Sequence, residues 1–89
     1  MVKQNVRVIN KLGLHARAAT KLVNEAAGYD CEILLCRDGQ QADAKSIMGI
    51  MMLAASQGTE LELVISGTDE RSALHSIVDL FENRFGEDE

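Results

Sequence analysis

The apolar residues of this 89-residue chain switch several times between the spacing of a strand and the spacing of a helix. This switching limits the fold more than any other feature. Residues 1–9 carry valines on one parity and cations on the other, which is typical of a half-buried strand. A helical stripe of apolar residues follows over residues 16–27, and Gly28 ends it. The chain therefore begins as a strand followed by a helix.

The remaining segments are predicted from the same periodicities and from turn residues. They are a strand over 31–36, a hairpin turn at Asp38-Gly39, a strand over 40–43, a short helix from Ser46 to Leu53, a strand over 59–66, a turn and cap at 67–69, and a last helix with apolar residues from Leu74 to Phe85, closed by Gly86 and an acidic tail. Helices that separate strands, with one hairpin in the middle, favour a single α+β domain over residues 1–89. We expect a four-stranded sheet covered on one face by three helices, in the order βαββαβα.

Size and charge exclude several classes of function. A domain this small buries only about 60–65% of its unfolded surface, so a shallow surface site is more plausible than an enclosed one. The 14 acidic against 9 basic residues give a net charge of −5, which argues against nucleic-acid binding. The first 24 residues nevertheless contain five cations and no acid, and this segment is suited to attract anions.

We expect a cytoplasmic monomer without cofactor or metal. No apolar run approaches the roughly 20 residues of a membrane span, and the N-terminus lacks the apolar core of a signal peptide. The two cysteines, Cys31 and Cys36, have no CxxC or histidine neighbour, so they are predicted to be inert thiols.

The stretch from Asn10 to Ala19 places His15 at the start of the first helix and Arg17 two residues later. The first-turn amides of a helix have no partner within the helix, and its dipole adds positive charge there. Such a terminus binds phosphate, and Arg17 adds a charge-assisted contact. The same field favours a neutral, nucleophilic imidazole. The alternative is that His15 is an ordinary cap or surface residue.

Two motifs carry a resemblance to a known family. Gly13-Leu14-His15-Ala16-Arg17 is followed, at matching spacing, by Ala44-Lys45-Ser46-Ile47-Met48-Gly49. Together they resemble the phosphocarrier protein HPr of the phosphoenolpyruvate-dependent phosphotransferase system. The resemblance covers essentially the whole chain, and it implies an open-faced β-sandwich with an antiparallel sheet under three helices.

The resemblance also implies a role for each residue of the site. His15 would accept a phosphoryl group on Nδ1 from phosphorylated enzyme I and pass it to a histidine of an enzyme IIA protein. Arg17 would stabilise the phosphoryl group, with help from the amides of Ala16, Arg17 and Ala18. The chain would then be a phosphoryl carrier and not an independent catalyst.

Ala18 departs from the family pattern, because HPr proteins usually carry proline at this position. Together with Asn10-Lys11-Leu12 and the acidic tail, this change favours the nitrogen-related branch, often called NPr. The alternatives are a sugar-transport HPr and a regulatory docking module, controlled at Ser46, that transfers no phosphate.

The second helix has two interpretations. Apolar residues at helical spacing normally face a core, which is the expectation for Ile50, Met51 and Leu53. The resemblance implies that this helix and the His15 helix dock enzyme I and enzyme IIA. The docking candidates are Ile47, Met48, Met51 and Lys21, and Met48 with Met52 would form an exposed, adaptable patch.

Ser46 also has two interpretations. It is first expected to cap the second helix. In part of the family the matching serine is phosphorylated by a dedicated kinase, which lowers phosphate acceptance at the histidine, so a Ser kinase/phosphorylase is a possible further partner.

Overall fold

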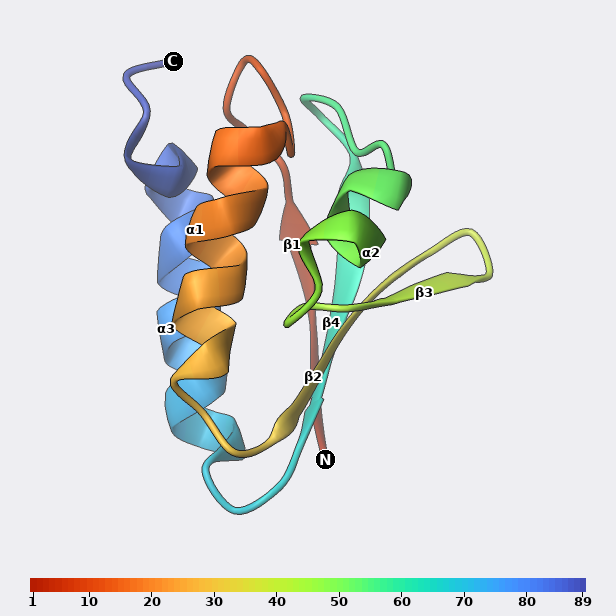
Figure 1. Ribbon diagram of the computed structural model, residues 1–89, viewed down its shortest axis with the longest axis vertical. Helices are drawn as coiled ribbons and strands as arrows, with labels where there is room; N and C mark the ends of the chain where they lie inside the picture. Colours follow the sequence, from red (N-terminus) through yellow and green to blue (C-terminus); the bar gives the residue numbers. More distant parts are fainter.

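The computed structural model describes all of residues 1–89, and it confirms the expected order of elements (Figure 1). The elements are β1 (Val2–Arg7), α1 (Ala16–Ala27), β2 (Glu32–Arg37), β3 (Gln40–Asp43), α2 (Ile47–Met52), β4 (Glu60–Ser66), α3 (Glu70–Glu82) and a short 3-10 turn, η1 (Arg84–Gly86). No helix has both the length and the apolar character needed to cross a bilayer.

The four strands form one antiparallel sheet in the order β1-β4-β2-β3. Val6 pairs with Leu61, and Leu35 pairs with Leu63, so buried residues of one parity line up across the strands. The other parity, which includes Glu60, is exposed or partly exposed. Because side chains alternate between the two faces of a strand, all three helices must cover the same face of the sheet. The expected α+β sandwich is confirmed.

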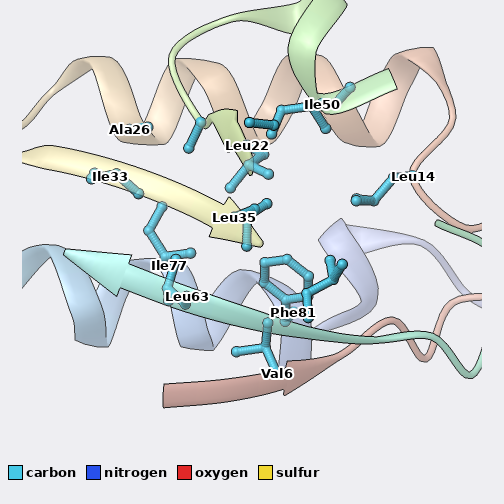
Figure 2. Packing of buried hydrophobic residues seen from close by; sticks show 14 of the residues in the cluster. Val6, Leu14, Leu22, Ala26, Ile33, Leu35, Ile50, Leu63, Ile77 and Phe81 are labelled. Carbon is cyan, nitrogen blue, oxygen red and sulfur yellow. The ribbon is translucent and has the colours of Figure 1, made fainter. Parts of the chain in front are cut away.

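The core lies between this covered face and the helices. Figure 2 shows Leu22 of α1, Ile50 of α2 and Phe81 of α3 directed toward Leu35 and Leu63 of the sheet. Each of these side chains is at most 2% exposed. Burying one such side chain contributes roughly 1.5–3 kcal/mol, so this layer holds the helices on the sheet. The helix starts remain at the surface.

Of the two predicted turns, the first has the expected geometry, whereas the second lacks the expected helix cap. Asp38 and Gly39 have φ values of +48° and +82°, which is the geometry of a tight hairpin between β2 and β3, as expected. Asp69 precedes α3 as predicted, but its carboxylate does not cap that helix. It accepts hydrogen bonds from the amides of Asp30 and Cys31, both at 3.0 Å, and so joins the start of α3 to the segment before β2.

The last helix is shorter than the sequence predicts. It ends at Glu82, and Arg84, Phe85 and Gly86 then adopt left-handed φ values of +55°, +54° and +78°. Phe85 is buried against Phe81, with ring centroids 4.9 Å apart in an edge-on arrangement. This contact offsets the cost of a left-handed turn at non-glycine residues. The turn sends the C-terminal tail (residues 87–89) back toward the start of α1 (Figure 1).

Both cysteines are free thiols. Burial, together with a hydrogen bond to Asp69, raises the pKa of Cys31 to about 11. Burial and the nearby Glu62 carboxylate also raise the pKa of Cys36. Since the thiolate is the reactive form, a raised pKa makes both side chains poor nucleophiles at neutral pH. The prediction of inert thiols agrees with this environment.

Candidate functional site

His15 is the residue immediately before α1, with an extended backbone (φ −73°, ψ 177°). The loop before it is fixed by Gly13, whose left-handed φ of +68° makes the turn. The Gly13 amide donates to the Asn10 carbonyl at 3.2 Å, and the amide of buried Leu14 donates to the Ala55 carbonyl at 2.9 Å. The His15 side chain remains 28% exposed, so its ring is held in place and still open to solvent.

The first turn of α1 presents unpaired donors beside this ring. The first intrahelical bond runs from the Ala19 amide to the His15 carbonyl at 2.8 Å, and the amides of Ala16, Arg17 and Ala18 donate no hydrogen bond within the protein. The Arg17 side chain is exposed and forms no ion pair. Free amides, the helix dipole and a free guanidinium together favour an oxyanion at this position. His15 and Arg17 line one pocket at this helix start, and their roles in holding a phosphoryl group stay predictions.

Glu87 also belongs to this site, although no motif or spacing in the sequence points to it. One of its carboxylate oxygens, Oε2, contacts Nε2 of His15, although the two residues are 72 positions apart. Its other oxygen, Oε1, accepts a hydrogen bond of 3.0 Å from Nδ2 of Asn10. The sequence pattern marks the acidic tail only as a feature of the branch, but the turn at Phe85 returns the tail to the protein and places Glu87 in the site.

Glu87 is charged at neutral pH. Burial alone would raise its pKa, but hydrogen bonds from Asn10 and His15, with the positive charge of Lys21 nearby, hold the pKa below the ordinary glutamate value. The imidazole thus faces a carboxylate on its Nε2 side, whereas no hydrogen bond engages Nδ1.

The ring opens into a pocket of about 780 Å³, whose lining is cationic on the α1 side. Lys11, Arg17 and Lys21 line it together with His15, and Leu12 is its one apolar residue. The tail closes another side, and Lys11 Nζ forms an ion pair of 3.5 Å with Glu89 Oε2 there. Lys21 Nζ donates to the Phe85 carbonyl at 2.7 Å, and the Lys11 amide donates to the Glu89 carbonyl at 2.8 Å. Glu87, Asp88 and Glu89 line the side formed by the tail, so the groups that favour an anion lie on the α1 side, next to the His15 ring.

The second helix presents an apolar surface. Met48 and Met52 are 72% and 76% exposed, and Ile47 and Met51 are partly exposed. Ile50 and Leu53 are buried, as expected, but the expectation that Met51 faces inward is wrong. A helix of six residues has room for only one buried stripe, which Ile50 occupies. The patch formed by Ile47, Met48, Met51 and Met52 is called the α2 patch below.

Ser46 caps α2 as predicted, because its Oγ accepts a hydrogen bond from the Gly49 amide at 3.1 Å. The side chain is half-buried at the edge of the α2 patch. Its modification stays a prediction, as does the docking role of Lys21.

The fold and the site define a small carrier domain, with a histidine on an open surface and donors for an anionic group around it. The family described as "PTS HPr component phosphorylation site" matches residues 2–83, and the chain belongs to this family. It is an HPr-type phosphocarrier of the phosphotransferase system and not a catalytic enzyme.

Comparison of the chain with individual proteins supports the same family assignment. The chain is 49% identical over 88 residues to "Phosphocarrier protein HPr" of Xylella fastidiosa strain Temecula1, covering 99% of each chain. It is 42% identical over 88 residues to "Phosphocarrier protein NPr" of Escherichia coli strain K12, covering 98% of each. The crystal structure of HPr-C-His from Thermoanaerobacter tengcongensis superposes with a TM-score of 0.96 at 42% identity, and the match covers both chains completely.

Proposed function

We propose that this carrier, acting as a monomer, accepts a phosphoryl group on Nδ1 of His15 from a phosphorylated enzyme I and delivers it to a histidine of an enzyme IIA protein. The observation that carries the proposal is the position of His15. Its ring is open to solvent at the start of α1, where three amides and Arg17 have no other partner.

The chemistry requires little more than positioning and charge neutralisation. The Nδ1 lone pair forms a bond to phosphorus while the bond from phosphorus to the donor histidine nitrogen breaks. The transferred oxygens would be held by the amides of Ala16, Arg17 and Ala18 and by the Arg17 guanidinium. The reverse step delivers the same group to the acceptor, so one exposed nitrogen serves two partners in turn.

The docking part of the proposal rests on the α2 patch. Flexible thioethers on an exposed surface suit a protein that binds more than one partner. Ile47, Met48 and Met51 supply the apolar contact, and Lys21 would meet acidic groups of the partner. No membrane or nucleic acid is needed as a partner.

The proposal also assigns the carrier to one branch of the phosphotransferase system. The nitrogen-related branch rests on Ala18, on Asn10-Lys11-Leu12 and on the acidic tail. The sugar-transport branch is the second candidate, because the relatives named HPr include proteins 49–50% identical to this chain, against 42% for the NPr of Escherichia coli.

The phosphoryl relay and its branch are tested together by incubating the protein with phosphoenolpyruvate and either a nitrogen-related or a sugar-type enzyme I. We expect a mass gain of one phosphoryl group that is lost in acid, and faster loading by the nitrogen-related enzyme. Faster loading by the sugar-type enzyme would reverse the branch. No loading by either enzyme would contradict the relay itself.

We propose that phosphorylation of Ser46 would weaken partner binding, because a phosphoserine adds nearly two negative charges at the edge of the α2 patch. Ser46→Asp is expected to slow loading of His15 by roughly tenfold, through a weaker affinity for enzyme I. Ser46→Asn, which retains a capping side chain without charge, is the matched control. Equal loading rates for both variants and the wild type would remove the regulatory role.

A further inference from the structure

The contact between His15 and the tail carries an inference that rests on the proposed function. We propose that Glu87 is a positioning residue for phosphoryl acceptance: its carboxylate occupies Nε2 of His15 and thereby leaves Nδ1 as the nitrogen that receives the group. The family match ends at residue 83, so Glu87 lies outside the matched residues.

The contact fixes where the imidazole proton resides. A carboxylate only accepts hydrogen bonds, so the hydrogen between Glu87 Oε2 and His15 Nε2 must be carried by Nε2. A neutral imidazole has one ring hydrogen, and Nδ1 therefore keeps its lone pair. A hydrogen bond to the other ring nitrogen orients reactive and metal-binding histidines in the same way.

Asn10 holds the carboxylate in this position. Its side chain is fully buried, and Nδ2 donates to the Gly13 carbonyl at 2.8 Å and to Glu87 Oε1 at 3.0 Å. Its Oδ1 is buried without a partner. An unpaired buried acceptor is unfavourable, so the amide orientation depends on the two bonds that Nδ2 makes. Asn10 thus links the loop before His15 to the residue that binds its ring.

The tail is anchored on both sides of Glu87. Before it, Phe85 is buried and its carbonyl accepts from Lys21 Nζ at 2.7 Å. After it, the Glu89 carbonyl accepts from the Lys11 amide at 2.8 Å. Figure 1 shows the C-terminal segment beside the N-terminal end of α1. Glu87 is therefore part of the site and not a freely moving end.

The carboxylate also assists the transfer. When the Nδ1 lone pair bonds to phosphorus and the donor's phosphorus–nitrogen bond breaks, the ring gains positive charge. The proton stays on Nε2, and the Glu87 carboxylate stabilises that charge. The carboxylate also repels the incoming phosphoryl oxygens. Asp88 and Glu89 line the same pocket and add to this repulsion, and Lys11 is paired with Glu89. Arg17, which forms no ion pair, and Lys21 oppose the repulsion.

The test uses phosphoramidate, a small phosphoryl donor that needs no enzyme I. The imidazole nitrogen attacks phosphorus, the bond from phosphorus to the amide nitrogen breaks, and that nitrogen leaves as ammonia. ³¹P and ¹⁵N NMR then report which ring nitrogen carries the phosphoryl group. We expect Nδ1 in the wild type, and in Glu87→Ala a rise of about tenfold in the ratio of Nε2 to Nδ1 product, which corresponds to the loss of one charge-assisted hydrogen bond.

Asp88→Ala is the matched control, because it removes an exposed charge of the same tail and pocket that forms no hydrogen bond or ion pair with His15. It should keep the wild-type ratio. The unphosphorylated wild type and this control should also show a downfield Nε2 proton that Glu87→Ala lacks. An unchanged ratio in Glu87→Ala, or an equal change in both variants, would overturn the inference. A failure of loading by enzyme I, with the phosphoramidate result intact, would instead contradict the proposed function.

Discussion

His15→Ala is expected to abolish phosphoryl acceptance from enzyme I and to leave the fold intact. The side chain supplies the only ring nitrogen in the pocket, and removal of a nucleophile typically lowers the rate by about 10⁴-fold or more. The ring is partly exposed and its one hydrogen-bond partner is Glu87, so little packing is lost. Acid-labile labelling from phosphoenolpyruvate measures the first effect, and thermal unfolding measures the second.

The second histidine of the chain provides a matched control. His75 lies on the exposed surface of α3, and its side chain forms no hydrogen bond or ion pair. His75→Ala should load at the wild-type rate. Acid-labile phosphate retained by His15→Ala, or lost with His75→Ala, would place the acceptor nitrogen elsewhere and contradict the site described here.

The local part of the site could be predicted from the sequence. His15 and Arg17 stand two positions apart at the start of a periodic apolar stripe. Their common position at the start of one helix can therefore be predicted from the local sequence alone. Glu87 could not be placed in this way. Its position depends on left-handed backbone at Arg84 and Phe85, residues that do not favour such a turn, and on the packing of Phe85 against Phe81. A contact across 72 positions has no periodic signal.

The fold followed from periodicity where a segment has one buried face. Alternation predicted β4, and apolar spacings of three and four predicted the α1 boundaries that the structure shows. The same spacing extended α3 through Phe85, because a buried aromatic residue four positions after Phe81 fits a helix as well as a turn. Met51 was misplaced for a related reason. Periodicity identifies apolar residues but does not tell which of them a six-residue helix can bury.

Gly13→Ala is expected to lower the free energy of unfolding by about 3 kcal/mol, because two effects combine. The residue has a left-handed φ of +68°, which is unfavourable for alanine. A methyl group there would also lie 2.6 Å from the Ala55 carbonyl oxygen and 2.9 Å from Cα of Ser56, so backbone must move. For a domain of this size the melting temperature should fall by roughly 15 °C.

The substitution should also slow phosphoryl acceptance. The Ala55 carbonyl that would be displaced is the acceptor for the Leu14 amide, one residue before His15. The Gly13 carbonyl itself accepts from Asn10, which holds Glu87. A shift of this loop therefore moves the ring and its carboxylate partner together. Since small misplacements of reacting groups are costly, we expect loading by enzyme I to fall by about tenfold or more at a temperature where the variant is folded.

Gly39→Ala separates the two effects. Gly39 also has a left-handed φ, +82°, but nothing lies within 4 Å of a methyl group placed there. In this control only the backbone strain acts. Its free energy of unfolding should therefore fall by about 1 kcal/mol, and enzyme I should load its His15 with phosphate at the wild-type rate. If the two variants lose equal stability, the close approach of the Gly13 loop to Ala55 is not what positions His15. If Gly13→Ala alone loses both stability and loading, the turn that shapes the fold also sets the geometry of the site.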